Sequence, residues 1–240
     1  MKTFLKIILV LIVLSVSIPF IAYKYFLSSG PRDLGVTFTD QDRQLAYVNN
    51  GVESVAITPS ADNAGGIIYE GQKEVKTAFT SAEITALNNS VKWVNYPVSK
   101  VQIKINPDGT GEASGVLDVR KILSWVSFTH SVKEIETKVN EYKIGFTPSF
   151  YLKGAVTVTD NKVSLTPQVI EVGRIVLPQN IVAENIGSVE KFVGDRLNAI
   201  PNLKIKSLNL DGGKVNLDAI YPQKEYSVQQ WKQPKLSRFY

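Results

Sequence analysis

Residues 79–90, FTSAEITALNNS, join a phenylalanine to a helix cap and a short apolar stripe, and residues 38–50, FTDQDRQLAYVNN, repeat this opening. Thr80 and Glu83 form the T-x-x-E capping box that begins many helices. The earlier copy has the same spacing, with aspartate in place of glutamate. Each copy, called here the first (38–50) and the second (79–90), therefore predicts a strand that enters one short amphipathic helix.

The apolar residues of both copies recur at helical spacing. In the second copy they are Ile84, Leu87 and Val91, and in the first copy Leu45 and Val48 lie three residues apart. Two interpretations stay open: coincidence, because many helices begin this way, or a structural unit that the chain repeats.

Three later segments alternate apolar and polar residues on both sides of a turn signal, which is typical of antiparallel hairpins. These segments, each with its turn, are residues 99–117 with 106–111, residues 150–172 with Asp160-Asn161, and residues 203–222 with Asp211-Gly212.

Helical patterns separate the hairpins, over residues 119–126, 131–142 and, at greatest length, 178–200. The longest helix carries a continuous apolar stripe formed by Val182, Ile186, Val189, Val193 and Leu197. The predicted fold class is therefore α+β, with a curved antiparallel sheet packed around one long helix and shorter helices.

A run of 17 residues without a charge, from Ile7 to Tyr23, precedes this body. A cleaved signal peptide would have a shorter apolar run and an A-x-A site, so we expect residues 1–27 to be an uncleaved transmembrane anchor. Lys2 and Lys6 on the amino-terminal side favour a single-pass topology with a cytoplasmic amino terminus. The anchor residues singled out are Ile7, Leu9, Leu11, Leu14, Pro19, Phe20 and Tyr23.

Three further regions follow the anchor. We predict a linker at 28–34, a domain outside the cytoplasm at 35–222 and a basic aromatic tail at 223–240. The tail has two interpretations, a flexible terminus or a segment whose aromatic and cationic side chains suit lipid headgroups.

The net charge of +5 does not indicate nucleic-acid binding. Lys2, Lys6 and Lys24 carry three of these charges and the tail from Lys224 carries another three, so residues 25–223 have a net charge of −1. A body this close to neutral lacks the electrostatic footprint of a phosphate-binding protein.

The sequence offers little for catalysis. It contains no cysteine, which excludes disulfides, thiolate metal sites and lipidated cysteine. Its single histidine, His130, would have to serve any Ser/His/Asp triad, and the carboxylates Asp40, Asp42, Asp108 and Asp118 are scattered. We therefore expect no enzyme activity, no metal and no cofactor. Asn88-Asn89-Ser90 is a formal glycosylation sequon.

Residues 163–197, VSLTPQVIEVGRIVLPQNIVAENIGSVEKFVGDRL, followed by LKIKSLNLDGGKVNLDAIYP at 203–222, resemble the end of a bacterial membrane-anchored tubular lipid-binding domain. This is the superfamily of bactericidal/permeability-increasing-protein-like folds. The resemblance covers Leu34 to Pro222 in element order and implies a curved sheet around a long helix, enclosing an apolar groove for acyl chains. The glycine-rich stretch after the first copy departs from a simple duplication.

These observations predict a membrane-tethered module outside the cytoplasm that binds lipid or another apolar ligand. Its expected partners are the membrane and a lipid, with no nucleic acid and with protein partners unknown. The alternative is an envelope interaction or scaffold protein without a small ligand. A hydrolase is a third class, and it would need His130 in a cleft beside a serine or a carboxylate.

Overall fold

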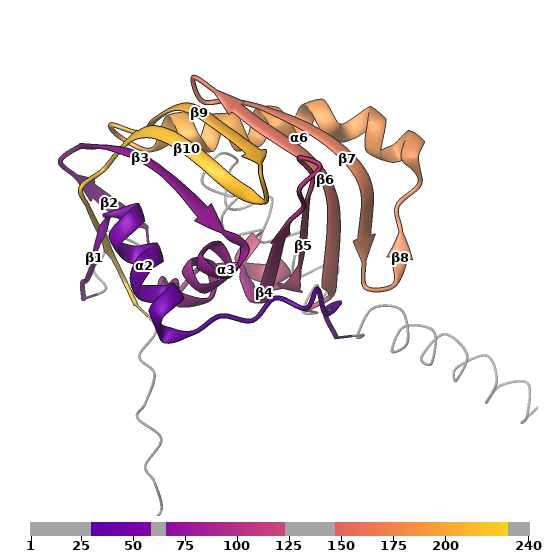
Figure 1. The fold of residues 1–240 in the computed structure, drawn as a ribbon, viewed down its shortest axis with the longest axis horizontal. Helices are drawn as coiled ribbons and strands as arrows, with labels where there is room; N and C mark the ends of the chain where they lie inside the picture. Colours follow the sequence, from indigo (N-terminus) through magenta and orange to yellow (C-terminus); the bar gives the residue numbers. More distant parts are fainter. Residues whose placement is uncertain (1–29, 59–65, 123–146, 230–240) are drawn as a thin grey trace, which may run out of the picture.

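The computed structural model describes residues 30–58, 66–122 and 147–229 of the 240-residue chain. The predicted anchor, His130, the helix at 131–142 and residues 230–240 lie outside these ranges. Among the described residues, no helix combines the length and hydropathy of a membrane span. The described chain is α+β with mostly antiparallel sheets, as predicted (Figure 1).

The main sheet has eight strands and divides at β6. One edge of β6 pairs with β7, which also pairs with the short β8. On its other edge, the first half of β6 pairs with β5, and the last two residues of β6 pair with β9. The sheet therefore has two arms beyond β6, one formed by β5 and β4 and the other by β9, β10 and β3. The strands are β3 (Lys73–Thr80), β4 (Val98–Ile105), β5 (Gly111–Leu117), β6 (Ser149–Thr159), β7 (Lys162–Val172), β8 (Ile175–Val176), β9 (Lys204–Asp211) and β10 (Lys214–Tyr221).

The three predicted hairpins are β4–β5, β6–β7 and β9–β10. Asp160 and Asn161 form the turn between β6 and β7 with φ values of 48° and 61°, the left-handed region that these residue types tolerate. The β9–β10 turn falls on Gly212 and Gly213, one residue later than predicted, because both turn positions need positive φ and glycine adopts it without strain.

A second sheet joins two strands from the first part of the described chain to the last strand. Its central strand, β11 (Lys224–Ser227), pairs in parallel with β1 (Glu53–Ala56) and antiparallel with β2 (Ile67–Glu70). The fold therefore continues beyond residue 222, the predicted end of the domain. The alternation of apolar and polar residues did not reveal β11, because this strand is only four residues long and its pairing partners are distant in sequence.

Both copies form the predicted helices, α2 (Asp40–Asn50) and α3 (Ser81–Ser90), and both begin with a complete capping box. The predicted strand before the helix forms only in the second copy, as β3, because β3 pairs with β10. In the first copy the prediction was wrong, since residues 30–39 are in no strand.

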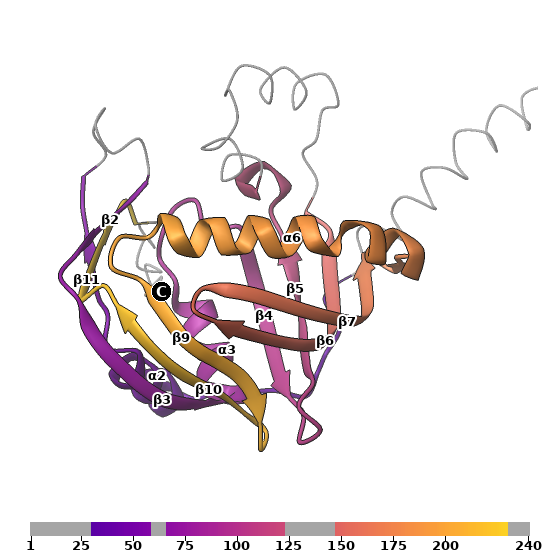
Figure 2. The same cartoon turned by 90° about the horizontal axis from the view of Figure 1, so that it is seen from above.

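The long helix is α6 (Gln179–Ala199), which runs back along the free edge of β7 (Figure 2). Leu165 N of β7 donates to Glu190 Oε1 at 2.7 Å. The predicted stripe of α6 is only partly covered, because Val182 is buried whereas Val189 is 44% exposed. Residues 119–122 are also helical.

The second copy closes the open edge of β4. Side chains on one face of α3, spaced four residues apart, hydrogen-bond to the backbone groups that a further strand would have engaged. The bonds are Ile105 N to Ser81 Oγ (2.9 Å), Ile103 N to Thr85 Oγ1 (2.9 Å), Thr85 Oγ1 to Ile103 O (3.2 Å), Val101 N to Asn89 Oδ1 (3.1 Å) and Asn89 Nδ2 to Val101 O (2.7 Å).

The main core fills the space between the two arms of the sheet. Phe79 of β3 packs with Ile105 of β4, Val158 of β6 and Leu217 of β10, and Ile84 of α3 covers the cluster. Side chains therefore fill the interior at this end of the molecule. A groove described below lies elsewhere on the molecule.

Residues 30–39, called here the strap, lie across the sheet before α2 begins (Figure 1). Arg32 forms two hydrogen bonds with the carboxylate of Glu171, at 2.8 and 3.0 Å, and Leu34 N donates to Gln102 Oε1 at 2.7 Å. The described part of the predicted 28–34 linker is thus bound to the domain, because a bidentate ion pair and a backbone hydrogen bond hold it to the sheet.

Candidate functional site

The candidate site is a groove of about 1350 Å³ on the first-copy side of the molecule. Its walls come from α2, the last turn of α3, the loop over residues 91–97, the adjoining ends of β4 and β5, and β11. The capping box of α2 and its packing against α3 position one wall, and the edge contacts of α3 with β4 position the opposite one. The groove therefore depends on both copies.

Part of the groove wall is apolar and open. Phe38, Tyr47 and Val91 all line the groove, and each leaves more than a third of its surface accessible. Leu87 and Val98 extend the same wall and are partly buried. Apolar side chains that stay exposed inside a concave site are typical of ligand pockets, because a ligand would remove them from water.

The groove also contains an excess of positive charge. Its cationic residues are Arg43, Lys92, Lys100 and Lys121, and its acidic residues are Asp118 and Glu225. Arg43 forms an ion pair with Asp40, yet its Nε atom is buried and has no hydrogen-bond partner among the described residues. The balance of charge favours an anionic group on any ligand that the groove binds.

Two tyrosine hydroxyls donate hydrogen bonds between parts of the groove wall. Tyr96 donates from its hydroxyl to Asn88 Oδ1 at 2.7 Å, and Tyr47 donates to Ser90 O at 3.3 Å. Burial raises the pKa of Tyr96 to about 12, so this hydroxyl stays protonated and donating at neutral pH. Both bonds fix the end of α3 relative to its neighbours.

The formal sequon lies in this same turn of α3. The side-chain amide of Asn88 donates to Ile84 O at 2.9 Å while its carbonyl accepts from Tyr96. Helical geometry and two hydrogen bonds thus occupy the side chain that glycosylation would modify.

The scattered carboxylates lie at three separate places in the fold. Asp40 and Asp42 lie in the first turn of α2, where hydrogen bonds with Thr39 in the capping box lower the pKa of Asp42. Asp108 lies in the β4–β5 turn, where bonds from Thr110 lower its pKa, and Asp118 follows the opposite end of that hairpin. The described residues hold no group of three or more His, Cys, Asp or Glu side chains placed to bind a metal.

The sequence assigned no residue to a ligand site, although Leu87, Val91 and Asp118, which it singled out for other reasons, line the groove. The clearest signal was the first copy itself, where Phe38 precedes the helix and Tyr47 lies on it, although this helix has few apolar residues to bury. Comparisons with protein-family models, curated proteins and solved structures found no match. The resemblance to tubular lipid-binding domains therefore stays a prediction.

Proposed function

We propose that this protein is a membrane-anchored module outside the cytoplasm that binds an amphiphilic, lipid-like ligand in the groove between α2, α3 and β4. The observation that carries the proposal is the combination of exposed apolar side chains and excess cations in one concave site of about 1350 Å³. The uncharged run from Ile7 to Tyr23 supports the anchor.

The proposed ligand would place its acyl chain on the apolar residues of the groove and its charged head on the cations. Burying an acyl chain against Phe38, Tyr47 and Val91 would contribute about 25 cal/mol for each Å² removed from water. The cations would attract a phosphate or carboxylate head, at a strength that falls with ionic strength. No covalent chemistry is required of the groove residues.

Photo-crosslinking tests this proposal on the full chain in detergent micelles. A phospholipid with a diazirine in its acyl chain is added, the sample is irradiated, and labelled peptides are mapped by mass spectrometry. We expect adducts on the peptides that contain Phe38, Tyr47 and Val91, and competition by unlabelled phospholipid. The matched variants are Tyr47→Asp, which places a charge on the apolar wall, and Val48→Asp, its exposed neighbour outside the groove.

Tyr47→Asp should remove most labelling of the groove, whereas Val48→Asp should leave it unchanged. Labelling restricted to residues 1–29, with the groove peptides unlabelled in the wild-type chain, would contradict a ligand in the groove.

One observation favours the scaffold alternative. Leu45 and Val48 lie on the outer side of α2, three residues apart, and Val48 is 77% exposed. An exposed apolar pair on a helix suits a protein partner. If the groove takes up no lipid and Val48→Asp abolishes capture of a partner protein from intact membranes, the scaffold function would be preferred.

A further inference from the structure

The strap follows one register row of the main sheet. Gln102, Ser114, Tyr151 and Glu171 are directly paired from β4 to β7, so their side chains share one face of the sheet. The strap contacts this row at both ends, through Leu34 N on Gln102 and Arg32 on Glu171. The sheet therefore fixes where residues 32–34 lie on the domain.

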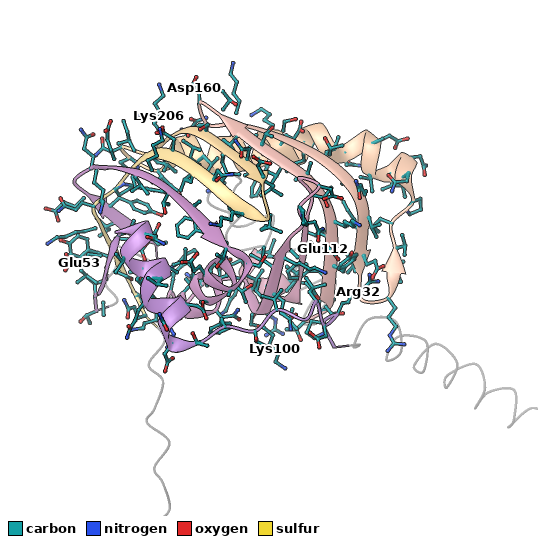
Figure 3. The ribbon with its side chains drawn as sticks, viewed as in Figure 1. Arg32, Glu53, Lys100, Glu112, Asp160 and Lys206 are labelled. Atoms are coloured by element: carbon teal, nitrogen blue, oxygen red, sulfur yellow. The ribbon has the colours of Figure 1, made fainter. Side chains whose placement is uncertain are left out.

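The contact at Arg32 is the stronger end of the strap. Its guanidinium lies 3.8 Å from the ring centre of Tyr151 while it pairs with Glu171. Figure 3 marks Arg32 on the same side of the molecule as Glu112. Tyr151 in turn donates to Glu112 Oε2 at 2.8 Å, and this bond is the main cause of the lowered pKa of Glu112. A bidentate ion pair stacked on a buried ring keeps residue 32 beside the end of β7.

Exposed apolar side chains gather where the strap leaves the sheet. The turn from β7 to β8 and the start of α6 present Ile175, Val176 and Ile181, and Val176 is 56% exposed. Arg174 of the same turn lines a small pocket together with Gly30 and Arg32, so the turn and the strap are neighbours. Residues 174–176 are called here the β8 tip.

The short stretch of chain between the predicted anchor and the strap limits how far the β8 tip can lie from the bilayer. Arg32 lies nine positions after Tyr23, the end of the uncharged run. Nine residues span at most about 30 Å when fully extended, and less in any other conformation. A domain held at Arg32 therefore keeps the β8 tip close to the membrane surface whenever the anchor is inserted.

We infer that the β8 tip rests on the lipid bilayer, and that the strap holds the domain in this orientation. The inference depends on the membrane anchor of the proposed function but not on the ligand in the groove. Ile175 and Val176 enter the interface between headgroups and acyl chains, where apolar side chains gain by leaving water. Arg174 lies at the same level, where its charge suits anionic headgroups.

Single-cysteine labelling tests this orientation cleanly, because the chain has no native cysteine. The full chain carries Val176→Cys, labelled with the environment-sensitive fluorophore NBD, in phosphatidylcholine and phosphatidylglycerol vesicles. A phosphatidylcholine with a nitroxide near its headgroup serves as the quencher. The matched control is Val48→Cys, an equally apolar and more exposed valine on α2, toward the opposite end of the molecule (Figure 1).

We expect roughly threefold more quenching at residue 176 than at residue 48, since interfacial apolar groups lie within about 5–10 Å of the headgroup boundary. Adding Arg32→Ala should lower quenching at residue 176, because the strap no longer fixes the domain. Circular dichroism checks that this variant is folded, and Glu171→Gln, which removes the charge of the partner, should act in the same direction.

A label at Leu14→Cys separates the two ways to fail. If residue 14 is quenched by a nitroxide deep in the acyl region while residues 176 and 48 are equally unquenched, the anchor is right and the inference about the β8 tip is wrong. If residue 14 is not quenched, the anchor and the inference are both overturned.

Discussion

α2 lies on the outer side of the molecule and α3 within it, although both follow Phe-Thr and both begin with a capping box (Figure 1). α3 buries Glu83, Thr85 and Ala86, whereas the only buried residue of α2 is Ala46. The two phenylalanines differ in the same way, since Phe79 is 3% exposed in the core and Phe38 is 37% exposed in the groove. Similar local signals thus begin two helices with different roles.

The difference arises on the helix face rather than at the cap. The three residues by which α3 binds the edge of β4 are Ser81, Thr85 and Asn89, and the first copy has Asp40, Gln44 and Val48 at the matching positions. All three of these α2 residues are exposed. α3 replaces a strand at the edge of β4 because short polar side chains recur every four residues on the face that meets it.

Replacing the two phenylalanines tests this comparison most severely. Phe79→Ala should lower the free energy of unfolding by about 3–5 kcal/mol, because it opens a cavity in the main core. Phe38→Ala should cost less than about 1 kcal/mol and should instead weaken lipid labelling of the groove. Chemical denaturation of the purified chain in mild detergent, followed by tryptophan fluorescence, measures both. Equal costs would show that the copies are equivalent in packing.

The edge contact of α3 gives the next largest effect. Thr85→Val keeps the size of the side chain but leaves Ile103 N–H and C=O without their partner, which should cost about 2–3 kcal/mol of unfolding free energy. Gln44→Val, at the matching position of α2, is the control and should change stability by less than about 0.5 kcal/mol. A similar small effect of Thr85→Val would mean that α3 is not needed to seal β4.

Alkaline titration gives the smallest effect and concerns the end of α3. The pKa of Tyr96 is raised from 10.0 to about 12 in the folded chain, so unfolding releases a proton between these values. Its contribution to stability is complete below pH 10 and is lost as the pH rises toward 12. Tyr96→Phe should cost about 1 kcal/mol at pH 7, through the lost bond to Asn88, and should make stability fall less steeply above pH 10.

Tyr69 serves as the internal reference in this titration, because burial also raises its pKa to about 12 and both proteins retain it. Some alkaline loss should therefore persist in the variant. Identical slopes for the two proteins above pH 10 would contradict the assignment to Tyr96.

Prediction from sequence succeeded where the signal is local. Thr80 with Glu83 marked a helix start, and Asp160-Asn161 marked a hairpin turn, because a cap or a turn is decided by a few neighbouring residues. It failed where a long-range partner decides the outcome. The predicted domain end at 222 left out β11. The prediction of a linker at 28–34 did not foresee the ion pair of Arg32 with Glu171, 139 positions away.

The candidate groove could not be predicted from sequence, and the reason is geometric. Leu45 and Val48 look like the buried face of an amphipathic helix, yet α2 packs through Ala46 and leaves both exposed. Spacing gives the face of a helix but not the neighbour that covers it. The groove lies between α2, α3, β4 and β11, which come from separate parts of the chain.

The sequence by itself determined the α+β class, the capped starts of α2 and α3, the three hairpins and the extent of α6, because each depends on interactions between residues close along the chain. The tertiary structure alone decided that α3 seals a sheet edge, that β6 serves two arms, and that the strap holds the domain at Arg32. Those features depend on which distant backbone groups and charges lack a partner, and only the folded arrangement brings the partners together.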